Sequence, residues 1–202
     1  MEQYKVQKGD KLGIVDLGSN SFRLLLGAYD GTQWMNEPKQ LWTTQLGRRS
    51  PEGALTEEAM VRGLDALKEI RNVMDAYGAT IRIGLATSAI REAGNGRDFL
   101  GRGQTVCPME YRVLSGDEEA MYGFIGATVY EDRNFHYATI DVGGGSTEIA
   151  LGHRDRVYMT KSYPAGAVRM QEMSSEGPQR VWEETSSMWD PLPIEGTFGE
   201  FI

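Results

Sequence analysis

The chain has 202 residues, of which 40% are apolar and 25% charged, as in an ordinary globular protein. Its net charge of −8 argues against a nucleic-acid partner, because a basic stripe would be expected on such a protein. No apolar run reaches the ~18–20 residues that cross a bilayer, and no apolar segment marks the first residues as a secretion signal. We therefore expect a cytoplasmic protein with neither a nucleic-acid nor a membrane partner.

Short apolar runs separated by turn residues predict antiparallel strands in the first part of the chain. These strands are expected over residues 12–16, 22–29 and 33–45. A helix follows, with Thr56 as its N-cap and Gly78 just past its C-terminus. Residues 81–86 then predict a buried strand parallel to the first, and a helix after Arg91 leads to a short strand over residues 111–114.

The second part of the chain begins another series of strands. Ser115 and Glu118 form a capping-box pattern at the start of a helix whose buried stripe should include Ile125 and Val129. Further strands are expected over residues 137–142, 147–151 and 157–161, and helices after Gly166 and over residues 170–184. Residues 197–202 resemble the beginning of one more strand, so we expect the second domain to be incomplete.

Two similar hexapeptides occupy equivalent places in the two parts. Residues 16–21 read D-L-G-S-N-S and residues 141–146 read D-V-G-G-G-S, and each joins one expected strand to the next. One such hexapeptide alone is compatible with an ordinary hairpin turn. Two of them predict duplicated β-β-β-α domains that face each other across a cleft.

Loops of this composition suit phosphate, because glycine lets successive backbone N–H groups surround an anion. Ser19, Asn20 and Ser146 add neutral hydrogen-bond donors. Asp16 and Asp141 would repel phosphate unless a cation lay between them, and Mg²⁺ held by one or two carboxylates, water and phosphate oxygens removes this conflict. The sequence has no G-x-x-x-x-G-K-[ST] pattern, which excludes a P-loop NTPase.

Four motifs in chain order carry a family resemblance. D-L-G-S-N-S-F-R, T-S-A-I-R-E-A, S-G-D-E-E-A and D-V-G-G-G-S-T-E resemble the exopolyphosphatase and guanosine pentaphosphate phosphohydrolase (Ppx/GppA) family, over about residues 11–169. The resemblance implies the α/β, ribonuclease H-like fold of the actin, Hsp70 and sugar-kinase group. Residues 1–131 would form the first domain, and residues 132–202 the start of a second domain that is apparently truncated.

The resemblance also implies an activity and its residues. The activity is release of terminal phosphate from inorganic polyphosphate or guanosine pentaphosphate, with Mg²⁺ or Mn²⁺ as cofactor. Glu119 resembles the residue that activates the attacking water, and Glu148 the carboxylate that assists it. Metal-binding positions of the family are matched by Asp16, Asp141 and Glu148. Its phosphate-binding positions are matched by Ser19, Asn20, Arg91, Gly143, Gly144, Gly145 and Ser146.

The helix pattern alone predicts different orientations for the two adjacent glutamates. Glu118 occupies the capping-box position and should bond back to Ser115, whereas Glu119 lies about 100° further round the helix and must point elsewhere. Without the family match, a carboxylate in this first turn is equally explained by the helix dipole. Arg91 likewise has a plain alternative, an ion pair with the neighbouring Glu92 on the surface.

Two other functions are compatible with these loops. One is a sensor that binds a phosphorylated alarmone without turnover, and the other is an actin-like ATPase. The presence of both Glu119 and Glu148 argues against the sensor, since binding an anion needs no extra carboxylates. The motifs T-S-A-I-R-E-A and S-G-D-E-E-A argue against the ATPase. Polyphosphate is the favoured substrate, and a homodimer is a candidate assembly because dimers are frequent in the family.

Overall fold

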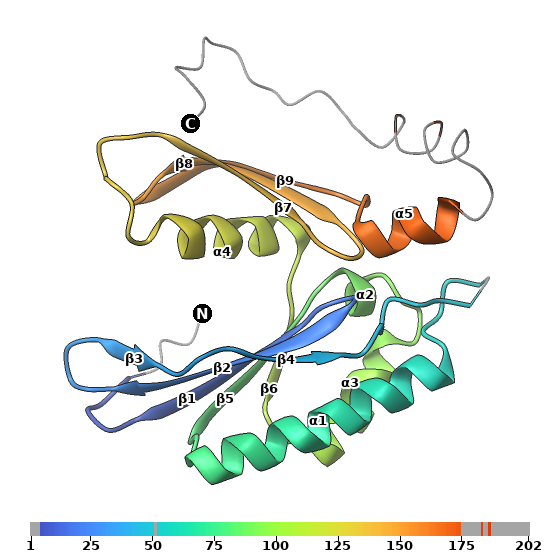
Figure 1. Cartoon of the computed structure of the whole chain (residues 1–202), viewed down its shortest axis with the longest axis horizontal. Coiled ribbons are helices and arrows are strands. Elements are labelled where there is room, and N and C mark those ends of the chain that lie inside the picture. Colours follow the sequence, from blue (N-terminus) through green and yellow to red (C-terminus); the bar gives the residue numbers. More distant parts are fainter. Residues whose placement is uncertain (1–4, 51, 175–182, 184–185, 187–202) are drawn as a thin grey trace.

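The computed structural model describes residues 5–50, 52–174, 183 and 186. Figure 1 shows two β-sheets, one above the other, with the tip of the β7–β8 hairpin lying near helix α2 of the lower part. No helix in these described ranges is long and apolar enough to span a bilayer.

The first sheet is mixed, and its strands follow the order β3-β2-β1-β5-β6 with β4 also paired to β2. The strands are β1 (Lys11–Leu17), β2 (Ser21–Tyr29), β3 (Trp34–Asn36), β4 (Gln40–Thr43), β5 (Ile81–Ala86) and β6 (Glu110–Val113). β1 and β2 form an antiparallel hairpin, and β5 runs parallel to β1 as predicted. The carboxyl ends of β1 and β5 therefore meet at one edge of the sheet, where ligands bind in open α/β sheets.

The strand predicted over residues 33–45 is two strands instead of one. β3 pairs with residues 27–29 of β2, and β4 pairs with residues 21–24. Pro38 lies between them and has no backbone N–H to donate to a ladder, which explains the interruption.

Helices α1 (Glu57–Tyr77) and α3 (Gly96–Val106) cover the same face of this sheet (Figure 1). The Thr56 side chain accepts a hydrogen bond from the N–H of Ala59, and Gly78 ends α1 in the left-handed conformation with φ 78°. Both capping predictions are confirmed. The helix expected after Arg91 is α3, which begins at Gly96, and an additional short helix, α2 (Ser88–Arg91), precedes it.

The second sheet is antiparallel, in the order β7-β8-β9. Its strands are β7 (Tyr137–Val142), β8 (Thr147–His153) and β9 (Arg156–Tyr163), and α5 (Ala167–Ser174) follows them. Helix α4 (Gly116–Thr128) packs against this sheet, with Phe124 and Ala150 in one core cluster. α4 thus lies before residue 131, the boundary predicted from the sequence, but contacts the strands that come after it.

The buried stripe predicted for α4 is partly wrong. Ala120, Phe124 and Thr128, spaced four residues apart, face the sheet, whereas Ile125 and Val129 are 44% and 39% exposed. Each exposed residue directly follows a buried one, so it lies about 100° away around the helix.

The helix predicted over residues 170–184 is described only in part. α5 continues to Ser174, and Glu183 and Ser186 are also helical. The other residues of that prediction, and the strand start expected over residues 197–202, lie outside the described residues.

Candidate active site

The loop between β1 and β2 has its carbonyl groups bound from one side. The Ser19 carbonyl accepts a hydrogen bond from the Gly47 N–H at 2.7 Å, and the Asn20 carbonyl accepts from the N–H groups of Thr44 and Gln45 at 3.0 and 2.9 Å. The segment after β4 therefore fixes this loop through its backbone.

The loop between β7 and β8 is fixed in the same way, by the first turn of α5. The N–H groups of Ala167 and Val168 donate to the carbonyls of Gly143 and Gly144 at 2.9 and 2.8 Å. The Arg169 side chain donates from Nε to the Gly145 carbonyl at 3.0 Å. The start of α5 therefore binds the carbonyls of three successive glycines, Gly143, Gly144 and Gly145.

This arrangement leaves backbone N–H groups available in both loops. In a trans peptide the carbonyl of one residue and the N–H of the next point in opposite directions. The bonds that hold the carbonyls of Ser19 and Gly144 therefore turn the N–H groups of Asn20 and Gly145 the other way. Within the described part of the chain, these two N–H groups donate to no other residue. Such amides are the donors that an anion-binding loop needs.

The two loops touch each other and the start of α2. A Cβ atom on Gly144 would lie 3.0 Å from the Cβ of Ser19, and one on Gly145 would lie 2.4 Å from the Oγ of Ser88. The hydroxyls of Ser19 and Ser88 are hydrogen-bonded at 3.0 Å. Glycine is required in the second loop because any side chain would separate the two sheets at this contact.

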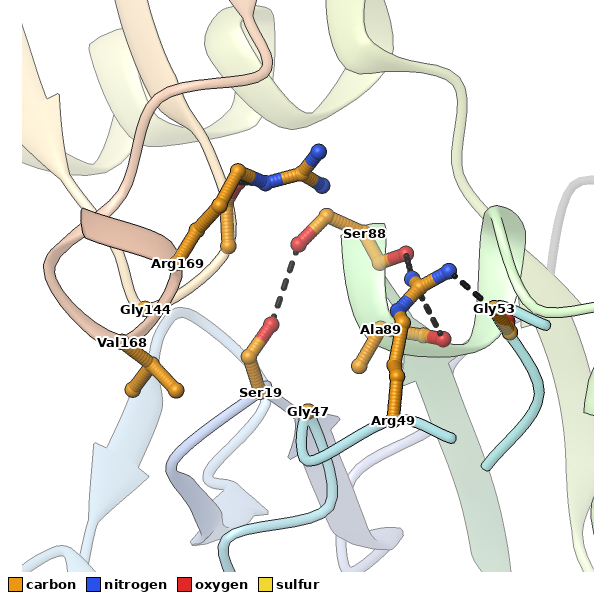
Figure 2. Close-up of a pocket in the computed structure, with 10 residues that line it drawn as sticks. Ser19, Gly47, Arg49, Gly53, Ser88, Ala89, Gly144, Val168 and Arg169 are labelled. Atoms are coloured by element: carbon orange, nitrogen blue, oxygen red, sulfur yellow. Dashed lines mark hydrogen bonds between the residues drawn. The ribbon is translucent and has the colours of Figure 1, made fainter. Parts of the chain in front are cut away.

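A pocket of about 300 Å³ opens at this contact (Figure 2). Three of its lining residues were predicted phosphate-binding residues, namely Ser19, Gly144 and Gly145. The pocket residues Arg49, Ser88 and Arg169 were not predicted from the sequence. Of these, only Ser88 lies inside a recognised motif, T-S-A-I-R-E-A.

An acidic centre lies apart from this pocket, and its first pair is Arg91 and Glu119. Arg91 Nη1 is 2.9 Å from the Glu119 carboxylate and 2.9 Å from the Leu114 carbonyl, so the end of α2 is bound to the start of α4. Burial raises the pKa of Glu119 from its ordinary 4.5 to about 7. The Arg91 guanidinium acts in the opposite direction, while the nearby Glu148 carboxylate raises this pKa further.

The second pair, Asp141 and Glu148, consists of like charges on neighbouring strands. These two residues are directly opposite each other in the β7–β8 hairpin. Glu148 is only 4% exposed, and its carboxylate accepts a hydrogen bond from Ser162 Oγ at 2.7 Å. Burial raises the pKa of Glu148, and the Asp141 carboxylate adds to that increase. Like charges directly opposite destabilise a sheet unless something offsets them.

In the β1–β2 hairpin, the equivalent aspartate is paired with a positive charge and not with a second carboxylate. Asp16 is paired across the strands with Arg23, whose guanidinium lies 3.0 Å from the carboxylate. Burial raises the pKa of Asp16, Arg23 opposes that increase, and Asp141 of the other sheet contributes to it. The two strand-end aspartates are therefore close enough to interact across the two sheets.

A close approach between α4 and β9 brings the two glutamates into the same region. A Cβ atom on Gly116 would lie 2.4 Å from the Cβ of Ser162, the residue that binds Glu148. Thr160 donates to Asp117 at 3.0 Å and fixes the same helix end. The first turn of α4, which carries Glu119, is thus packed against the strand that orients Glu148.

Among the described residues, no three Asp, Glu, His or Cys side chains form a ready-made metal cluster. Mg²⁺ does not require one, since it is commonly held by one or two carboxylates together with water and substrate phosphates. The paired carboxylates of Asp141 and Glu148, with Asp16 nearby, fit a cation of this kind. The predicted roles of these three residues as metal ligands stay predictions.

The remaining predicted phosphate-binding residues lie at the edges of these two regions. Ser146 is buried, and Asn20 is exposed with its side chain 3.3 Å from Ser21 Oγ. Gly143 donates from its N–H to the Ser146 carbonyl at 2.9 Å and so closes its loop. Arg91 contacts Glu119, and its predicted contact with phosphate stays a prediction.

The model of the Ppx/GppA phosphatase family matches residues 35–186, about three quarters of the chain. The chain belongs to the Ppx/GppA phosphatase family. It is 30% identical to Exopolyphosphatase 1 of Mycobacterium leprae over 79% of this chain and 48% of that protein. It is also 33% identical to a bifunctional 3-dehydroquinate synthase/phosphatase of Fusobacterium nucleatum, over 78% of this chain and 25% of that protein.

Solved structures of family members resemble this chain along most of its length. An exopolyphosphatase from Cytophaga hutchinsonii is similar with a TM-score of 0.75 and 24% identity, over 88% of this chain and 64% of that one. The PPX-GPPA enzyme of Aquifex aeolicus gives a TM-score of 0.69 with 26% identity, over 91% and 65%. These similarities confirm the predicted α/β fold of the Ppx/GppA family. The chain spans about half the length of the curated exopolyphosphatase it matches.

In this Ppx/GppA chain, the raised pKa of Glu119 predicts how stability depends on pH. The folded state holds this proton up to about pH 7, whereas the unfolded state releases it near 4.5, so the stabilisation is complete below 4.5 and is lost as the pH rises through 7. Without metal, the free energy of unfolding should fall between about pH 5 and 8, relative to Glu119→Gln, by on the order of 2 kcal/mol. Urea denaturation at both pH values measures this difference. Parallel pH profiles for the two proteins would contradict the assignment.

Proposed function

We propose that this chain is the amino-terminal part of a Mg²⁺-dependent phosphohydrolase that releases the terminal phosphate of inorganic polyphosphate or of guanosine pentaphosphate. The observation that carries the proposal is the position of Glu119. Its carboxylate has a pKa near the operating pH and lies in one centre with Arg91 and Glu148, close to loops with available N–H groups. A general base works best in this pKa range.

In this proposal Glu119, in its ionised form, accepts a proton from the attacking water. The water oxygen forms a bond to the terminal phosphorus while the bond from that phosphorus to the bridging oxygen breaks. The leaving phosphate chain carries the electron pair away on that oxygen. Arg91 holds the Glu119 carboxylate in place at 2.9 Å, and Glu148, oriented by Ser162, helps to position the water.

The phosphate itself would be bound by the loop amides, including those of Asn20 and Gly145, with the hydroxyls of Ser19 and Ser146 nearby. Asp16, Asp141 and Glu148 would hold Mg²⁺, or Mn²⁺ in its place. When bound, the cation offsets the charge of the phosphate oxygens and of the leaving group. It would also offset the repulsion between Asp141 and Glu148.

The test is orthophosphate release from long-chain polyphosphate, guanosine pentaphosphate and ATP, each with Mg²⁺ and with EDTA. We expect release from polyphosphate that stops in EDTA, with guanosine pentaphosphate as the other candidate substrate. Release that is undiminished in EDTA would contradict the metal. Release from ATP alone would contradict the substrate class, and no release from any of the three would contradict the proposal for this chain.

A further inference from the structure

Two arginines in the pocket of Figure 2 share a single carboxylate. Arg169 forms an ion pair with Glu92, and Arg49 Nη2 lies 3.6 Å from the same Glu92 oxygen. Both arginines line the pocket together with Ser19 and Ser88. The printed contacts thus place two guanidinium groups beside one carboxylate at this wall of the pocket, in a chain whose overall charge is −8.

This pocket is separate from the acidic centre. None of the described residues that line it is an acid, and Arg91 is not among them. The two regions are joined by the phosphate loops, since Ser19, Gly144 and Gly145 line the pocket and also follow β1 and β7, the strands that carry Asp16 and Asp141 near their ends. The pocket and the acidic centre therefore both border the same two loops.

The arginines are held in place by the surrounding backbone. Arg49 donates to the carbonyls of Ser88 and Ala89 at 3.3 and 3.2 Å, and to Gly53 at 3.3 Å. Arg169 donates to the carbonyl of Gly145 at 3.0 Å, and Figure 2 shows its guanidinium pointing toward Ser88. Because these arginine side chains are already held in place, they lose little conformational entropy when an anion binds.

We infer that this pocket is a second anion site, where Arg169 and Arg49 take a phosphate group of a condensed phosphate and Glu92 acts as the counter-charge that the phosphate displaces. That the ligand is a condensed phosphate rests on the proposed function. Glu92 and the phosphate compete for the same guanidinium groups. Arginine suits this exchange because its planar group binds carboxylate and phosphate in the same way.

The test is isothermal titration of pyrophosphate into the full chain, in EDTA and at constant ionic strength, so that no turnover occurs. Arg169→Gln should weaken binding by about tenfold or more, the loss expected for a charge-assisted hydrogen bond. Glu92→Gln should tighten binding several-fold, because it removes the competing charge. Matched controls are Arg102→Gln and Glu57→Gln, an ion pair at 2.7 Å whose two side chains lie outside the pocket, and both should bind as the wild type does.

The opposite signs of the two variants make the result specific. Structural damage would weaken binding in both, so tighter binding by Glu92→Gln supports the site even if Arg169→Gln is destabilised. Wild-type affinity in Arg169→Gln, or weaker binding in Glu92→Gln, would overturn the inference. Orthophosphate titrated in parallel should bind more weakly than pyrophosphate, and equal affinity would overturn the condensed-phosphate assignment. A chain that gives the expected binding pattern but hydrolyses nothing would keep the anion site and lose the hydrolase proposal.

Discussion

Glu119→Gln is expected to lower the rate of orthophosphate release from polyphosphate by about two to four orders of magnitude, the range for loss of a general base. The amide keeps the size of the side chain and can still contact Arg91, which now lies 2.9 Å from the carboxylate. It cannot accept the proton of the attacking water. Steady-state kinetics of phosphate release with Mg²⁺ measure the effect, which should appear in kcat and much less in KM.

Glu118→Gln is the matched control, because it makes the same chemical change one position earlier. Glu118 is bound to the Ser115 N–H at 2.8 Å in the capping box and lies outside the acidic centre. Its amide can also accept this bond, so activity should stay within a few-fold of the wild type. Equal losses in the two variants would show that the start of α4 matters only for folding and would remove the role of Glu119.

Gly166→Ala is expected to have the second largest effect, by moving the second phosphate loop. A Cβ atom at this position would lie 2.5 Å from the carbonyl carbon of Gly144 and 2.6 Å from that of Gly145. Both atoms are backbone, so the loop itself must move. A shift of about 1 Å at a catalytic group can reduce the rate by about a hundredfold, and the overpacking should cost about 1–3 kcal/mol of stability.

Gly101→Ala provides the control for this variant. Gly101 lies within α3, and a Cβ atom there has no neighbour within 4 Å. This substitution should stabilise the helix by up to about 1 kcal/mol and leave phosphate release unchanged. Chemical denaturation and kinetics of both variants separate the two effects. A Gly166→Ala protein with wild-type activity would contradict the tight contact between α5 and the loop.

The local chemistry of the sequence predicted the parts of the site that depend on neighbouring residues. The repeated hexapeptides predicted two hairpin loops, and both loops are present with an aspartate near the end of the preceding strand. The capping box predicted that Glu118 and Glu119 point in different directions, and Glu119 indeed contacts Arg91 while Glu118 contacts Ser115. These features arise from spacing along one strand or one helix, which the sequence displays directly.

Features that depend on contacts between distant residues could not be predicted in this way. Glu92 and Arg169 are 77 residues apart, and only the approach of α5 to α2 brings them together. The residues that lie opposite the two aspartates, Arg23 and Glu148, can be identified only when the strand registers are known. The registers show that Arg23 offsets the charge of Asp16 in the β1–β2 hairpin, whereas Glu148 adds a second carboxylate beside Asp141 in the β7–β8 hairpin.

The prediction of the buried face of α4 was partly wrong for a different reason. The helix is apolar on more than one side, so periodicity alone does not identify the buried face. The sheet selected the row that contains Phe124, and Ile125 and Val129 were left exposed.

The most direct test of the central claim is orthophosphate release from long-chain polyphosphate in water enriched in oxygen-18, with Mg²⁺. If a water in the acidic centre attacks the terminal phosphorus, each orthophosphate released by the wild type carries one oxygen from the solvent, and Glu119→Gln releases almost none. Release of unlabelled orthophosphate, or equal labelled release by the wild type and Glu119→Gln, would contradict the account.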